Sequence, residues 1–192
     1  FLSANESDVN EANKLGLPAG LVLPTKAKDE AQTSELRIAF DFDSVLADDE
    51  AEKVYQENGL NTFHASEELK AHQPLKPGPL QDLAKKLALW QEKEKRLSEK
   101  NTEYSPLLRI AIVTARNAPA HERCIRTLNE WGLIATETFF MGGIDKSRVL
   151  KVFKPHLFID DQMSHLEELA AEVPCVHIPF GAANTKPAGT DK

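Results

Sequence analysis

The sequence contains little cysteine, no long apolar segment and no excess of basic residues. Its 192 residues include two cysteines, Cys124 and Cys175, too few for a disulfide framework or a cysteine-rich zinc site. No apolar run approaches the roughly 18 residues that cross a membrane, and the first residues lack the pattern of a secretory signal. The formal net charge of −7 argues against a nucleic-acid partner, whose phosphates favour a basic surface. We therefore expect a cytoplasmic protein that binds neither membranes nor nucleic acids.

The pattern of apolar residues indicates an α/β fold. A hydrophobic content of 41% with 28% charged residues is ordinary for a globular protein. Short apolar runs alternate with segments of helical periodicity. The predicted strands are residues 36–40, 107–113, 136–141, 157–159 and 175–178, and the predicted helices are residues 48–58, 63–72, 80–90, 120–131 and 142–153, with another that ends at Leu169. This alternation predicts a Rossmann-like, three-layer α/β/α fold, a parallel sheet with helices on both faces.

Two carboxylates follow the first predicted central strand. The apolar run 36–40 stops at Asp41 and Asp43, at the carboxyl end of a strand, where open α/β sheets bind their ligands. Burying ionised carboxylates costs several kcal/mol unless a cation or hydrogen bonds compensate. The pair therefore indicates either a metal or catalytic site, or a strand-ending turn in which Asp43 caps the next helix.

Polar residues also stand at the ends of other predicted elements. Thr114 follows the strand 107–113, Lys146 opens a helix, and Asp160 and Asp161 follow the strand 157–159. In a parallel sheet these ends lie on one rim, so the residues can converge. Phosphoryl transfer through an aspartate requires three kinds of group: carboxylates that hold Mg²⁺, a carboxylate nucleophile with a second acid beside it, and Thr or Lys donors for the phosphate. The residues at these ends include all three kinds.

These residues resemble the four motifs of the haloacid dehalogenase superfamily of aspartyl phosphatases. Asp41-Phe42-Asp43-Ser44-Val45, Thr114, Lys146 and Asp160-Asp161 match in order. The resemblance implies that Asp41 is the nucleophile and a metal ligand, and that Asp43 is the general acid and base and binds metal through its carbonyl. It further implies that Thr114, Ala115 and Lys146 hold phosphate, and that Asp160 and Asp161 bind or orient Mg²⁺, with Asp161 the first choice for direct ligation.

A narrower resemblance, to the cytosolic 5'-nucleotidase type I family, covers nearly the whole chain. It is carried by the stretches 36–52, 74–80, 113–116, 131–133, 155–163 and 179–181. It implies Mg²⁺-dependent hydrolysis of nucleoside 5'-monophosphates such as AMP, without fixing the base, the sugar or whether the protein forms a homo-oligomer. Phe42 stands where the family has glycine, which we expect to alter packing beneath the site. The open alternatives are a phosphatase for another small phosphate ester and a non-catalytic nucleotide or phosphate sensor.

Substrate choice is expected in a small helical cap inserted after the first central strand. The cap candidates are Asp49, Phe63 and His64, and Arg116 and Asn117 are candidates from the core side, although each alone is more often a packing or solvated residue. The six histidines lack metal-ligand spacing and are assigned no metal role.

We divide the chain into four parts by these patterns. Residues 36–46 and 106–182 form the haloacid dehalogenase-like core, 47–105 the cap, and 183–192 a loose tail. Residues 1–35 are interpreted as the end of a degenerate N-terminal half plus a linker, because Phe1-Leu2-Ser3-Ala4-Asn5 resembles Phe158-Ile159-Asp160-Asp161-Gln162 and a helix and a strand follow both. Chance similarity of two strand-helix-strand units is the alternative. Since Ser3 and Ala4 replace the carboxylates, no chemistry is expected there.

Overall fold

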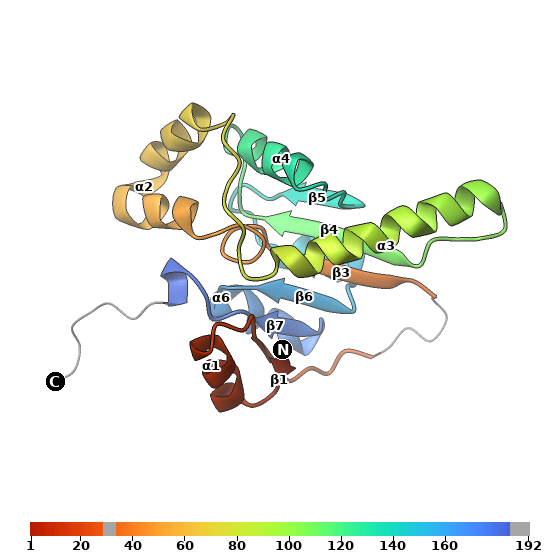
Figure 1. Ribbon diagram of the computed structural model, residues 1–192. Coiled ribbons are helices and arrows are strands. Elements are labelled where there is room, and N and C mark those ends of the chain that lie inside the picture. The colour runs from red at the N-terminus through yellow and green to blue at the C-terminus, as the bar shows by residue number, and fades with distance from the viewer. Residues whose placement is uncertain (29–33, 185–192) are drawn as a thin grey trace.

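The computed structural model describes residues 1–28 and 34–184 and shows a seven-stranded sheet flanked by helices (Figure 1). The order across the sheet is β1-β2-β7-β6-β3-β4-β5, and every neighbouring pair is parallel except β2 and β7. The strands are β1 (Leu2–Ser3), β2 (Gly20–Val22), β3 (Leu36–Phe40), β4 (Leu108–Thr114), β5 (Glu137–Phe140), β6 (Leu157–Asp160) and β7 (Cys175–His177). The predicted α/β class is confirmed.

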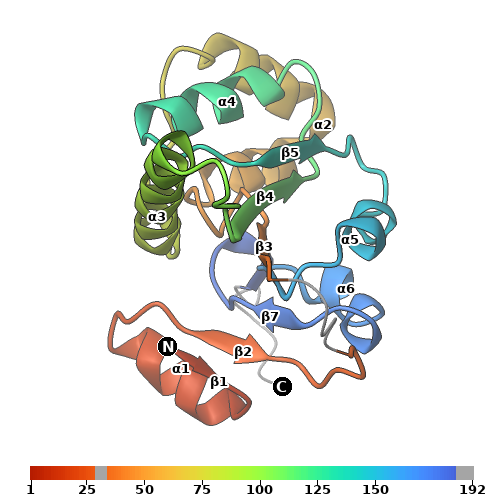
Figure 2. The same ribbon diagram turned by 90° about the vertical axis from the view of Figure 1, so that its right-hand side faces the viewer.

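Helices cover both faces of this sheet, as Figure 2 shows. They are α1 (Glu6–Lys14), α2 (Glu50–Leu69), α3 (Gln81–Lys100), α4 (His121–Glu130), α5 (Ser147–Phe153) and α6 (Met163–Leu166), with 3₁₀ turns at Leu169–Ala171 and Ala182–Asn184. Alternate residues of β3 point to opposite faces: Phe40 packs in the cluster beneath α3 and α4, and Ala39 in the cluster beneath α5 and α6. Among the described residues, no helix is long and apolar enough to cross a membrane.

Helix α2 folds back on itself in the middle. A straight helix of 20 residues would be about 30 Å long, yet Lys70 Nζ lies 2.6 Å from Glu50 Oε1, at the opposite end. The corner is Gly59, whose φ of 77° is open to glycine but strained for other residues. The predicted helices 48–58 and 63–72 are therefore the two arms of α2. In Figure 1, α2 lies beyond the carboxyl ends of the strands, to which the arrows of β4 and β6 point.

Helix α3 is longer than the predicted helix 80–90. The helix continues through residues 91–100, and one acidic residue of this extension is buried. Glu94 is 1% exposed and accepts hydrogen bonds of 3.0 Å from Tyr104 Oη and from the backbone N–H groups of Leu107 and Leu108. Helix α3 lies within the predicted cap insertion 47–105. It nevertheless packs against β4 and is part of the helical layer on that face of the sheet.

The N-terminal strand-helix-strand unit mirrors β6, α6 and β7. In both units the two strands are parallel, and the units meet through the antiparallel pair β2 and β7. Ser3 Oγ accepts a 3.0 Å hydrogen bond from the N–H of Asn5, as Asp160 Oδ1 accepts one of 2.8 Å from Gln162. A Cβ on Gly20 would lie 2.5 Å from Val176 Cγ1, so the contact between the units requires glycine there. Both units therefore have the predicted strand-helix-strand form, and their origin as a repeat stays a prediction.

The structure describes only part of the predicted linker and of the predicted C-terminal tail. Of the linker, residues 29–33 lie outside the described residues, as do 185–192 of the tail. Ala183 and Asn184 belong to a 3₁₀ turn that touches the site, so the loose tail does not begin at 183. The division into domains otherwise stays a prediction.

Replacing Glu94 with alanine should lower the free energy of unfolding by about 2–4 kcal/mol, because three buried or half-buried donors lose their acceptor. Urea unfolding followed by circular dichroism measures this. Glu92→Ala is the matched control: Glu92 is exposed and pairs with Arg96 on the same helix, so its loss should cost less than about 0.5 kcal/mol. Equal losses in the two variants would contradict the structural role of Glu94.

Candidate active site

The register of the central strands brings the predicted rim residues together. Phe40 of β3 lies opposite Ile159 of β6 and Ile112 of β4. The next residues along β3 and β6 are Asp41 and Asp160, which therefore emerge side by side. Thr114 ends β4 on the other flank of β3. Hydrogen bonding of the sheet thus places Asp41 beside Asp160, although the two are more than 100 positions apart in sequence.

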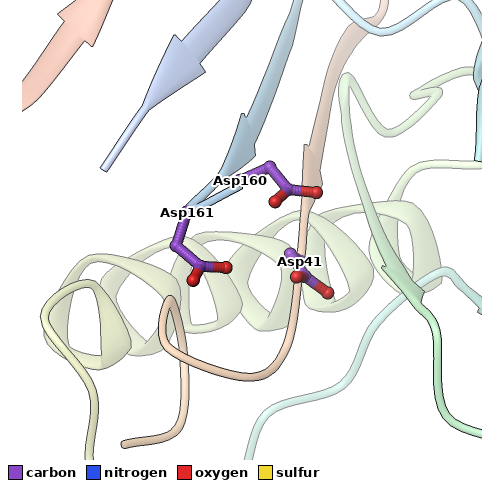
Figure 3. Close-up of side chains that lie close together, drawn as sticks. All are labelled: Asp41, Asp160 and Asp161. Carbon is purple, nitrogen blue, oxygen red and sulfur yellow. The ribbon is translucent and has the colours of Figure 1, made fainter. Parts of the chain in front are cut away.

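Three buried carboxylates form the centre of this rim. One oxygen each of Asp41, Asp160 and Asp161 lies within 4.8 Å of the others, and Figure 3 shows the three side chains gathered at the ends of β3 and β6. Lys146, at the start of α5, is 4% exposed and places Nζ 3.0 Å from Asp41 Oδ2 and 2.7 Å from Asp160 Oδ2. Its burial between two carboxylates shows that Lys146 is not a solvated surface residue.

Asp160 is the most firmly held of the three. Its Oδ1 accepts the N–H of Gln162, and His165 Nδ1 lies 3.1 Å from its Oδ2. Burial by itself would raise the pKa of Asp160, but Lys146 and His165 outweigh it and lower the pKa to about 2. Burial alone would lower the pKa of Lys146, but the carboxylates of Asp160 and Asp41 raise it above its ordinary value. Asp160 and Lys146 therefore form a charged pair at the base of the site.

Asp41 and Asp161 carry negative charge that the protein does not fully compensate. Burial, followed by the neighbouring acids, raises the pKa of Asp161 to about 9. Burial also raises the pKa of Asp41 to about 7, although Lys146 opposes the shift. Asp161 Oδ2 is buried and has no hydrogen-bond partner among residues 1–28 and 34–184. Three clustered carboxylates with an unpartnered oxygen fit a hard divalent cation such as Mg²⁺.

The carboxylate of Asp43 binds Arg116 and does not cap the following helix. Arg116 Nε donates to Asp43 Oδ2 and a terminal nitrogen donates to Oδ1, both at 2.8 Å. Arg116 is 3% exposed and also donates to the carbonyl of Ala120 and to Glu67. Its guanidinium lies over Phe42, 5.3 Å from the ring centroid, so Phe42 packs beneath the site; how this packing differs from that of a glycine stays a prediction. Asp43 does not cap α2, whose first residue is Glu50.

The predicted phosphate-binding residues lie on both flanks of β3: Thr114 ends β4, and Lys146 lies beside Asp160 at the end of β6. Thr114 is buried at the end of β4, and its Oγ1 accepts the N–H of Arg116 at 3.2 Å. Ala115 lines the cavity described next and a second one of about 310 Å³ that also includes Lys146. Their role in holding phosphate stays a prediction.

A cavity of about 350 Å³ adjoins Asp43. Its polar and apolar walls are lined by Asp43, Glu52, Tyr55, Leu60, Phe63, Ala115, Arg116, Asn117, Gly142, Gly143, Gln162 and His165. Three of the predicted substrate residues, Phe63, Arg116 and Asn117, are therefore at the cavity. His64 contacts it indirectly, through a 3.1 Å hydrogen bond to Asn117. Asp49 is not in the lining and pairs instead with Lys53 Nζ at 2.9 Å.

The chain was compared with known families and proteins. A family model described as 5'-nucleotidase matches residues 1–185. The chain belongs to the 5'-nucleotidase family. Over 169 residues, 87% of its length, it is 37% identical to a Homo sapiens protein named Cytosolic 5'-nucleotidase 1B, and it spans 27% of that relative. No solved structure is significantly similar to it. The resemblance to cytosolic 5'-nucleotidases of type I is confirmed.

Three residues at the site of this 5'-nucleotidase family member were not predicted from the sequence. His165 contacts Asp160, although the spacing of the histidines gave His165 no role in the sequence analysis. Asn184 Nδ2 donates to the carbonyl of Asp161 at 2.9 Å. Glu67, on α2, binds Arg116 from the side away from Asp43. A His five residues after a rim acid is a weak signal, and nothing near Glu67 in sequence indicates its partners.

Asp161→Asn should stabilise the cation-free protein by about 1–3 kcal/mol, because it removes a buried, poorly compensated charge. The pKa of Asp161 is about 9 in the folded chain and 3.8 ordinarily, so the folded state binds this proton more tightly and loses stability as pH rises between these values. Since asparagine does not ionise, the advantage of the variant should grow from about pH 4 to about pH 9.

Urea unfolding in the presence of a chelator, at several pH values, measures this difference. The exposed acid Asp82 provides the control, and Asp82→Asn should show no such pH trend. A destabilised Asp161→Asn protein in chelator would contradict the uncompensated charge.

Proposed function

We propose that the chain hydrolyses nucleoside 5'-monophosphates to nucleoside and phosphate through a phosphoaspartate on Asp41. The observation that carries the proposal is the position of Asp41, buried beside Lys146 and the Asp160-Asp161 pair and two residues from a second acid. Membership in the 5'-nucleotidase family supports the choice of substrate. The name of the human relative supports a cytoplasmic location.

In the first step, a carboxylate oxygen of Asp41 attacks phosphorus while the bond from phosphorus to the 5'-oxygen breaks. The electron pair of that bond goes to the 5'-oxygen, which takes a proton from the carboxyl group of Asp43, and the nucleoside leaves. In the second step a water attacks phosphorus and gives its proton to Asp43. The bond from phosphorus to Asp41 breaks, which restores both carboxyl groups and releases phosphate.

Lys146 and Thr114 serve the phosphate in this scheme. An anionic nucleophile repels an anionic phosphate, and the ammonium of Lys146, 3.0 Å from Asp41 Oδ2, offsets part of that repulsion. The buried hydroxyl of Thr114 supplies a donor on the opposite flank of β3.

We further propose that Mg²⁺ is held by Asp41, Asp161 and the backbone carbonyl of Asp43, with Asp160 in support. Asp161 is the better direct ligand because its Oδ2 is unpartnered in the described part of the chain, whereas Asp160 already binds Lys146 and the N–H of Gln162. When bound, the ion would neutralise the carboxylates and the negative charge of the phosphate.

The nucleoside is proposed to occupy the 350 Å³ cavity beside Asp43. Tyr55 and Phe63, whose ring centroids are 6.2 Å apart, offer an aromatic wall for the base. Asn117 and Gln162 offer amide groups for polar atoms of the base or the sugar. An aromatic surface beside amides suits a nucleoside better than a sugar alone.

A panel of phosphomonoesters, assayed for released phosphate with Mg²⁺, tests this function. Nucleoside 5'-monophosphates should be hydrolysed faster than sugar phosphates. Asp41→Asn should reduce turnover at least about 10³-fold without loss of folded structure, because it removes the nucleophile. Asp82→Asn should keep normal turnover. A faster rate on sugar phosphates would favour the other-ester alternative, and nucleotide binding without phosphate release would favour a sensor.

Mg²⁺ should bind the protein directly and be required for turnover. We expect Mg²⁺ at 100 times its dissociation constant to raise the free energy of unfolding by about 2.7 kcal/mol. Asp161→Asn should lose most of this stabilisation, measured by thermal unfolding with and without the ion. An unchanged response in Asp161→Asn would exclude Asp161 as a ligand.

A further inference from the structure

A buried chain of charges connects Asp43 to helix α2. Arg116 stands between two acids: its Nε and one terminal nitrogen bind Asp43, and its other terminal nitrogen binds Glu67. Arg116 and Glu67 are 3% and 2% exposed. In the described part of the chain, both hydrogen bonds to the Asp43 carboxylate come from Arg116. The orientation of Asp43 therefore depends on this one guanidinium.

Glu67 is shared with a second arginine that does not touch Asp43. Arg123, on α4, donates to Glu67 Oε1 at 2.7 Å and to the carbonyl of Gln73 at 2.8 Å. Arg123 also lies 3.5 Å from Glu50, at the start of α2. Glu67 thus fastens the second arm of α2 to the end of β4 and to α4 at the same time.

The surroundings of Arg116 fix the plane of its guanidinium. The rings of Phe42 and Phe63 lie 5.3 and 5.6 Å from its central carbon, and the carbonyl of Ala120 accepts a further 3.0 Å hydrogen bond. A planar guanidinium with two parallel hydrogen bonds to a carboxylate fixes both its position and its tilt, which a lysine cannot do. All these contacts are within the protein, which argues against the predicted role of Arg116 in binding substrate.

We infer that Arg116 is a positioning residue that holds Asp43 for proton transfer to the leaving oxygen, and that Glu67 couples this position to the docking of α2. The inference rests on the proposed function, in which Asp43 is the acid. Positioning errors of about 1 Å can cost about 100-fold in rate. Loss of Arg116 should therefore slow only the reactions that need the proton of Asp43.

Rates with two different substrates distinguish a positioning role of Arg116 from a general structural role. Release of a nucleoside from AMP requires protonation of an alkoxide, whereas 4-nitrophenyl phosphate releases a nitrophenolate that is stable without a proton. We would measure the first product in single turnovers, with enzyme in excess and Mg²⁺ present, so that only the phosphorylation of Asp41 is observed.

Arg116→Lys should slow nucleoside release from AMP by about 100-fold and nitrophenolate release by less than about threefold. Glu67→Gln, which keeps an acceptor but removes its charge, should shift the ratio of the two rates in the same direction by about 10-fold. It carries the test if Arg116→Lys does not fold.

Arg123→Lys is the matched control, since it disturbs the same Glu67 without a contact to Asp43. It should lower the melting temperature about as much as Arg116→Lys, while the ratio of the two rates stays at the wild-type value. Equal losses on both substrates in Arg116→Lys would overturn the inference, as would a raised KM for AMP with unchanged kcat, which is the mark of a substrate contact. A wild-type protein that releases neither product would overturn the proposed function itself.

Discussion

Three buried carboxylates face one buried ammonium at the carboxyl ends of β3 and β6, and this imbalance governs the site. Lys146 and Asp160 neutralise each other, and burial, followed by the neighbouring acids, raises the pKa values of Asp41 and Asp161. Such a cluster is unfavourable for the folded chain on its own. The proposed Mg²⁺ would offset this cost, because the charges that reduce the stability of the folded chain are the ones that would attract a cation.

The sheet supplies the rigidity that this cluster needs. Because β3 is hydrogen-bonded to β4 on one side and β6 on the other, the acids that follow β3 and β6 cannot separate without breaking the sheet. Hydrophobic packing on both faces adds to this, with Phe40 and Phe158 fully buried on opposite sides. Second contacts then orient the acids from outside the strands: Arg116 holds Asp43, and Asn184 holds the backbone of Asp161.

Features that depend on neighbouring residues could be predicted from the sequence. Strand β3, the pair Asp41 and Asp43, and the acids after β6 all follow from an apolar run that ends in polar residues. Features that depend on distant charges could not. The burial of Glu94 requires knowing that the N–H of Leu108 lies beside it, and the binding of Arg116 to Asp43 and Glu67 joins three separate segments. The sequence predicted separate helices over residues 48–58 and 63–72, but only the contact between Glu50 and Lys70 shows that these two arms fold back together.

The trio of Glu67, Arg116 and Arg123 also constrains how this protein can change over evolution. Each side chain is buried and each pairs with at least one other member of the trio, so a single neutral substitution upsets the charge balance among the buried partners that remain. The positions can therefore vary together far more easily than one at a time. An alignment of relatives would show them as an invariant or covarying set for reasons of charge balance, and invariance at these positions would not by itself identify a residue that touches substrate.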